Sequence, residues 1–209
     1  MKMIQSGLLS ILLLGFTLGI KHATEPDHVI AVSTIASQTK RLSRSSLAGI
    51  FWGLGHTAIL LLIGIIVISF GQHISGSIAL SLELIVGMML VYLGLSGFKS
   101  DKAINVVAIK HFHKKSFLIG GIHGLAGSAA LVIMTTAQAQ NSREAFLFML
   151  IFGVGTIFGM LLFTTILGLP FLLSLRQKKL SINITRVASI ISIVYGVYYM
   201  IEVGRNFFI

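Results

Sequence analysis

The chain has 209 residues, of which 55% are hydrophobic and only 11% are charged, and its formal net charge is +10. Soluble globular domains carry roughly 25% charged residues, so this composition excludes them and predicts an all-α integral membrane protein. The basic residues lie in short segments between apolar runs, which indicates membrane topology and excludes a nucleic-acid partner. The absence of cysteine excludes disulfides and thiolate metal sites.

The first apolar segment, residues 5–36, is too long for one straight transmembrane helix. At 1.5 Å per residue it would reach about 48 Å, against roughly 30 Å for the hydrocarbon core. Its beginning resembles a signal peptide but lacks a clear cleavage site, so we expect it to be retained. Pro26 removes a backbone donor and disfavours helical geometry at Glu25. We therefore predict that the first helix is broken near Pro26.

Five further segments complete a predicted set of six spans within a single transmembrane domain, residues 1–209. They cover residues 46–71, 76–98, 116–138, 144–172 and 184–204. Lysine and arginine concentrate in the first, third and fifth loops, at residues 38–45, 99–115 and 175–186. The positive-inside rule places these loops in the cytoplasm and both termini outside.

The two halves of the chain, about 1–100 and 116–209, resemble each other. "GIKHATEPDHVIAVSTIASQ" from Gly19 aligns with "GIHGLAGSAALVIMTTAQAQ" from Gly121, and "FWGLGHT" from Phe51 aligns with "IFGVGTI" from Ile151. The offsets are 102 and 100 residues. Since each half has three spans, the second copy is inverted, which predicts a 3+3 inverted repeat. The alternative is chance similarity between apolar helices.

Ionisable residues inside a membrane segment are costly, and the first segment contains a cluster of them. On an unbroken helix, His22, Asp27 and His28 would point in different directions, but a break at Pro26 lets them converge. Imidazole and carboxylate ligands suit nickel, cobalt, zinc or copper(II). These three residues are therefore predicted to bind a metal ion. The alternative is a polar network that only stabilises the kink.

Four other residues have two or more interpretations each. Glu25 is a further ligand, a carboxylate that orients a histidine, or an ion-pair partner of Lys21. His56 is either a metal ligand, a transit site on the inward path of the ion, or a histidine that only forms a hydrogen bond between helices. His123, which aligns beside His22 in the repeat, is a ligand at the pseudo-symmetric position, but its small neighbours favour tight helix packing. Glu83 lines an ion entrance or reaches the membrane interface.

Other polar residues are assigned less specific roles. His73, His111 and His113 lie in or beside loops, where a solvated role is favoured. The four tyrosines are predicted to be interface or packing residues.

"HATEPDH" from His22 fits the pattern of histidine, four residues, aspartate and histidine, and "IFWGLGHT" from Ile50 follows it. Both segments resemble those of the nickel/cobalt transporter (NiCoT) superfamily. The compact form and "HGLAGSAALVIM" from His123 look more like its branch of urease accessory membrane proteins. The resemblance implies that His22, Asp27, His28 and His56 serve metal transport. The larger permeases also carry an acidic motif in the second half, which this chain lacks.

Together, the residues and the resemblance predict a permease of the cytoplasmic membrane that imports Ni²⁺, or Co²⁺, as its substrate. We expect no enzymatic activity and no resident cofactor. Delivery of nickel to urease is implied by the resemblance alone. The alternatives are a non-transporting accessory or metal-sensing protein, and an exporter of another ion. The sequence leaves the oligomeric state open.

Overall fold

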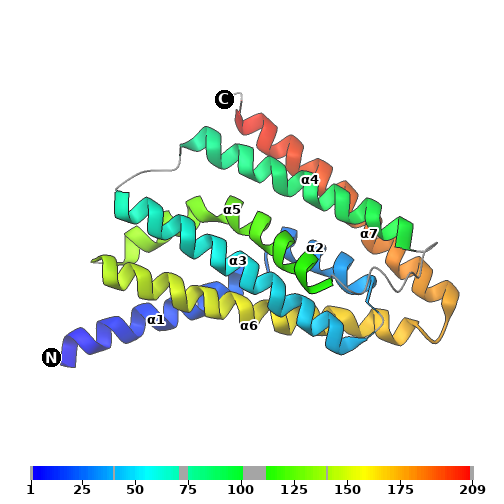
Figure 1. Ribbon diagram of the computed structural model, residues 1–209, viewed down its shortest axis with the longest axis horizontal. Helices are drawn as coiled ribbons and strands as arrows, with labels where there is room; N and C mark the ends of the chain where they lie inside the picture. The colour runs from blue at the N-terminus through cyan, green and yellow to red at the C-terminus, as the bar shows by residue number, and fades with distance from the viewer. Residues whose placement is uncertain (1, 40, 71–74, 101–111, 140, 208–209) are drawn as a thin grey trace.

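The computed structural model describes residues 2–39, 41–70, 75–100, 112–139 and 141–207, which form seven helices and no strand (Figure 1). The helices are α1 (Lys2–His22), α2 (Pro26–Ser37), α3 (Leu42–Phe70), α4 (Gly76–Ser100), α5 (Phe112–Gln138), α6 (Ser142–Ser174) and α7 (Lys178–Phe207).

The predicted break of the first segment is confirmed, because α1 ends at His22 and α2 begins at Pro26. Glu25 precedes α2 with φ −61° and ψ 144°, the extended geometry that a following proline favours. Pro26 occupies the first turn of α2, where its missing N–H has no helical partner to lose. Proline chemistry therefore ends one helix and starts the next.

Four helices within the described residues are long and apolar enough to cross a membrane. They are Leu42–Phe70, Gly76–Phe98, Ser142–Ser174 and Lys178–Asn206. Leu9–His22 forms a shorter apolar helix, and α5 coincides with the predicted span 116–138. The chain is thus an all-helical, multi-pass membrane protein, and the count of six spans stays a prediction.

Large apolar side chains cover much of the outer surface. Leu13 is 58% exposed, Leu118 is 64% exposed and Leu173 is 69% exposed. Soluble proteins rarely expose apolar surface on this scale, because water penalises it. In a bilayer the same surface contacts lipid chains at no such cost.

Glycines allow two pairs of helices to approach until backbone meets backbone. A Cβ at any of four glycines would collide with a carbonyl oxygen on the facing helix, as expected for small residues at membrane helix interfaces. The contacts join Gly19 to Phe152 and Gly155 to Phe16 between α1 and α6, and Gly120 to Trp52 and Gly55 to Phe117 between α3 and α5.

The break between α1 and α2 lies beside a cavity of the bundle. Helix α3 packs against both α5 and α6, α1 packs against α6, and α4 pairs with α7 (Figure 1). The short α2 contacts α4, α6 and α7. Thr24, Glu25 and Pro26 at the interruption are exposed, whereas Ala23 and His28 on either side are buried. Irregular backbone at membrane depth is tolerated where it is buried in protein or lines a water-filled cavity.

Candidate metal site

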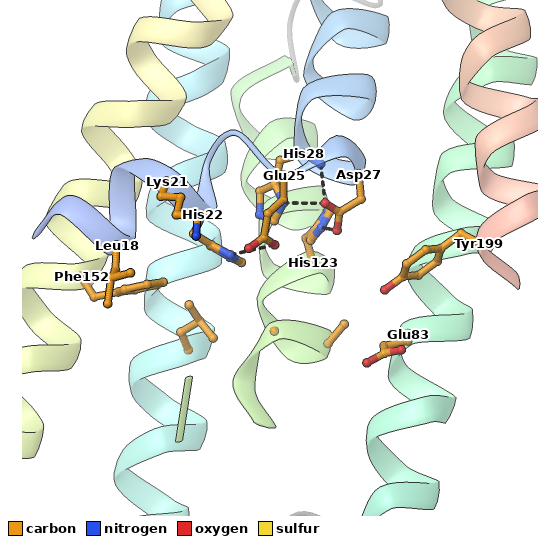
Figure 2. Close-up of a pocket in the computed structure, with 13 residues that line it drawn as sticks. Leu18, Lys21, His22, Glu25, Asp27, His28, Glu83, His123, Phe152 and Tyr199 are labelled. Carbon is orange, nitrogen blue, oxygen red and sulfur yellow. Dashed lines mark hydrogen bonds and ion pairs between the residues drawn. The ribbon is translucent and has the colours of Figure 1, made fainter. Parts of the chain in front are cut away.

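The turn between α1 and α2 brings three residues of the predicted site together. The Thr24 N–H donates to the carbonyl of Lys21 at 2.9 Å, and the Glu25 N–H donates to that of His22 at 3.1 Å. The chain then restarts as α2, so that the rings of His22 and His28 lie 4.5 Å apart between centroids. Figure 2 shows Asp27 and both of these histidines directed into one cavity.

A third histidine joins this pair from α3, and we call His22, His28 and His56 the three-histidine set. One ring nitrogen of each lies within 4.8 Å of the others. The Nε2 atoms of His22 and His56 are 3.1 Å apart. Two nitrogens bound to one ion at roughly 2.0–2.1 Å each would be about 3 Å apart. The separation therefore suits either one hydrogen bond or two bonds to a shared ion.

Carboxylates orient two of these three imidazoles. Glu25 Oε2 lies 3.0 Å from His22 Nδ1, and Asp27 Oδ1 lies 3.1 Å from His28 Nδ1. The backbone N–H of His28 also donates to Asp27 Oδ1 at 2.9 Å. A carboxylate on one ring nitrogen fixes the ring and leaves the other nitrogen free to bind a metal. Glu25 thus has the geometry of the histidine-orienting interpretation.

Helix α5 supplies a fourth histidine, His123, whose Nε2 lies 2.7 Å from Asp27 Oδ2. Asp27 therefore bridges two imidazoles, one through each carboxylate oxygen (Figure 2). Asp27, His28 and His123 form a second group whose potential ligand atoms lie within 4.8 Å of one another, and we call it the Asp27 set. His28 is common to both sets.

The histidine cluster is buried and incompletely hydrogen-bonded. His28, His56 and His123 are at most 2% exposed. Within the described residues, His28 Nε2, His56 Nδ1 and His123 Nδ1 have no hydrogen-bond partner. An unpaired buried polar atom costs about 1–3 kcal/mol. A cation bound by the free lone pair of His28 would offset that cost.

A cavity of about 280 Å³ opens beside the cluster. Lys21, Glu25 and Asp27 line it on the side of the helix break, and Glu83 of α4 and Tyr199 of α7 line it on the opposite side (Figure 2). A cavity of this size accommodates a hydrated ion. Polar side chains therefore line the cavity on both sides.

The structure brings the predicted residues together to different degrees. His22, Asp27, His28 and His56 converge, together with Glu25 and His123. Glu83 lines the same cavity from α4 without contacting the histidines through any described hydrogen bond or ion pair. Within the described part of the chain, neither Glu25 nor Asp27 pairs with Lys21.

Two residues near the site were not predicted to belong to it. Tyr199, expected to be an interface or packing residue, lines the cavity because α7 packs beside α2. Trp52 is buried, and its ring centroid lies 5.6 Å from that of His123. Both placements depend on which helices meet, which no local sequence pattern indicates.

Histidines outside the cluster have other surroundings. His113 is exposed near the start of α5, with its ring centroid 4.7 Å from that of Phe51. His73, His111 and most of the basic loop 99–115 lie outside the described residues.

Comparison with known proteins places this chain in a family. A family model described as "High-affinity nickel-transport protein" (NicO) matches residues 8–98. The chain is 47% identical to "Urease accessory protein UreH" of Bacillus sp. (strain TB-90), over 96% of this chain and 94% of that protein. The chain belongs to the NicO nickel-transport family, in its UreH-type branch. No solved structure matches the chain.

The chain is also similar, at lower identity, to two plant proteins. The Arabidopsis thaliana "Chloroplast protein FOR GROWTH AND FERTILITY 1" is 23% identical over 95% of this chain, and "Chloroplast protein FOR GROWTH AND FERTILITY 2" is 24% identical over 80%. The alignments span 60% and 49% of the plant proteins, respectively.

The NicO match also divides the site. Residues 8–98 include the three-histidine set together with Glu25, Asp27 and Glu83. His123 lies beyond this segment, in the second half of the chain. The nickel-transport family is therefore recognised from the half that carries the broken helix.

Proposed function

We propose that the chain is a secondary permease that imports Ni²⁺, and Co²⁺ by the same ligand chemistry, across the cytoplasmic membrane. The observation that carries this proposal is the convergence of three imidazoles and two carboxylates at a helix break inside a nickel-transport family member. Imidazole is a suitable ligand for nickel, and a buried, partly unsatisfied cluster favours cation binding.

The site can dehydrate an ion in stages. The ion enters the cavity past Glu83, where a carboxylate attracts a dication that still holds water. His22, His28 and His56 then replace part of the water shell, while Glu25 and Asp27 supply negative charge. Neutral imidazoles bind without a permanent charge of their own, so the ion is released inward past His56 rather than trapped.

Six spans in a 3+3 inverted repeat belong to the same proposal, and the glycine contacts support it. The contact of Gly19 with Phe152 has a counterpart in that of Gly120 with Trp52, related by shifts of 101 and 100 residues. The contact of Gly155 with Phe16 corresponds in the same way to that of Gly55 with Phe117. Such reciprocal pairs are expected from a two-fold axis between the halves.

These contacts favour a register for the first repeated segment that differs by one residue from the sequence alignment. Gly19 corresponds to Gly120 rather than to Gly121, so that His22 corresponds directly to His123. The sequence alignment chose a shift of 102 because the Gly-Ile pair matched by letter. Backbone packing is the stronger criterion, since identical letters are common in apolar helices.

The orientation follows from the basic segments at residues 38–45, 99–115 and 175–186, which we place in the cytoplasm with both termini outside. The name of the UreH relative refers to urease. By that resemblance, the imported nickel would serve urease maturation.

The test is Ni²⁺ uptake by proteoliposomes that contain the purified full chain. We expect time-dependent, saturable uptake by the wild-type protein and its loss in His22→Ala and His28→Ala. His113→Ala is the matched control, because it removes an exposed histidine away from the cluster and leaves uptake intact. Uptake that survives both site substitutions would refute the proposed site. Wild-type protein that binds Ni²⁺ without uptake would instead favour a non-transporting accessory or sensor.

A further inference from the structure

His28 connects two groups of ligand atoms with different chemistry. The three-histidine set offers nitrogen atoms only, whereas the Asp27 set offers one carboxylate oxygen and two imidazole nitrogens. The three-histidine set joins the broken first segment to α3. The Asp27 set joins α2 to α5 in the second half of the chain.

The two nitrogens of the His28 ring have different surroundings. Nδ1 of His28 lies 3.1 Å from Asp27 Oδ1, within the Asp27 set. Nε2 of His28 is buried and has no hydrogen-bond partner among the residues that the structure describes. The centroid of the His28 ring lies 4.0 Å from that of His123 and 5.2 Å from that of His56, so His28 is situated between these two histidines.

A neutral imidazole has one nitrogen with a free lone pair and one that carries a proton. An ion bound to His28 Nε2 therefore needs the proton on Nδ1, where Asp27 accepts its hydrogen bond. An ion bound to Nδ1 needs the proton on Nε2. With neutral His28, the two sets can bind an ion in alternation but not together.

We propose that Asp27, His28 and His123 form a second position for a divalent transition-metal ion, occupied in alternation with the three-histidine position. Within the transport mechanism proposed above, on which this step rests, His28 passes the ion between the two positions. The exchange adds a carboxylate to the ion's ligands and removes the imidazoles of His22 and His56. The second position makes His123 a metal ligand rather than only a helix-packing residue.

The burial of His123 supports a ligand role. It is 2% exposed, its Nε2 contacts the carboxylate of Asp27, and its Nδ1 has no partner within the described residues. Gly124 beside it lets α5 approach the backbone of His56, because a Cβ there would lie 2.5 Å from the His56 carbonyl oxygen. Gly124 thus lets α5 pack closely enough to bring this ring to the site.

The experiment measures Ni²⁺ binding by the purified full chain, independently of transport. The double variant His22→Ala/His56→Ala removes two members of the three-histidine set. We expect it to retain one Ni²⁺, bound at least about tenfold more weakly, with two imidazoles instead of three in X-ray absorption spectra. Adding His123→Ala should abolish this residual binding. Adding His113→Ala, the matched control, should leave it unchanged.

The single variant His123→Ala completes the design. We expect it to keep one Ni²⁺ with three imidazole ligands while its uptake into proteoliposomes falls about tenfold or more. Should the alanine variants fail to fold, as judged by thermal unfolding, the corresponding glutamine variants are measured in the same way.

Each outcome has a distinct meaning. A folded double variant that binds no Ni²⁺ overturns the second position, as does residual binding that is unaffected by His123→Ala. In both cases wild-type uptake can persist, and the proposed permease function stands. Wild-type binding without uptake refutes the permease function, whereas the double and triple variants still decide the second position. A wild-type chain that binds no Ni²⁺ overturns both proposals.

Discussion

Replacing Asp27 with asparagine tests the electrostatic design of the site with little change in shape. Asp27 contacts the ring and backbone N–H of His28 and the ring of His123, and its side chain is only 15% exposed. Asparagine keeps one oxygen that can still accept a hydrogen bond from His28. The substitution removes the negative charge and places an NH₂ group where Asp27 Oδ2 faces His123.

The size of the effect can be bracketed. A carboxylate about 6 Å from a dication attracts it by about 5.5 kcal/mol at an effective dielectric constant of about 20, before the cost of desolvation is subtracted. Removing a carboxylate behind a metal-bound histidine lowers metal affinity by about 10- to 100-fold. We therefore expect Ni²⁺ affinity to fall by about 10- to 100-fold, equivalent to about 1.4–2.7 kcal/mol.

The assay is a Ni²⁺ titration of purified Asp27→Asn against wild-type protein at pH 7.5. Glu202→Gln is the control for the same change in charge, because Glu202 is half exposed on α7 and pairs with Arg205 at 3.9 Å. It should bind Ni²⁺ as the wild type does. An Asp27→Asn protein whose affinity stays within about twofold of wild type would refute the carboxylate–histidine argument.

Two further predictions concern packing and protons. Gly19→Ala should lower the free energy of unfolding by about 1–3 kcal/mol, because its Cβ meets the backbone of Phe152; Gly76→Ala, where a Cβ meets nothing within 4 Å, should not. Equal unfolding midpoints for the two variants in detergent would contradict the close-packing account. Ni²⁺ affinity should fall when the pH is lowered far enough to protonate the ligand imidazoles, because protonated rings cannot bind a metal. In titrations at a series of pH values, a Ni²⁺ affinity that rises as the pH is lowered would contradict binding by neutral histidines.

The break of the first segment was accessible from the sequence because it depends on local chemistry. Proline lacks a backbone donor and restrains Glu25, whatever surrounds them. Span length added an independent reason, since residues 5–36 exceed the bilayer. The convergence of His22, Asp27 and His28 followed from the same break.

The contacts of His123 were harder to predict. His123 was linked to His22 through the repeat, but its approach to Asp27 depends on how closely α5 packs beside α3. That distance is set by backbone contacts at Gly120 and Gly124, which a sequence shows only as a run of small residues. Tyr199 entered the cavity for a similar reason, through the packing of α7 beside α2.

The most direct test of the account is anomalous scattering from a crystal of the chain soaked with nickel. We predict one peak within bonding distance of ring nitrogens of His22, His28 and His56, or of the ligands of the Asp27 set. A peak confined to surface residues such as His113, with the buried histidines free of metal, would contradict the claim that the broken helix binds the transported ion.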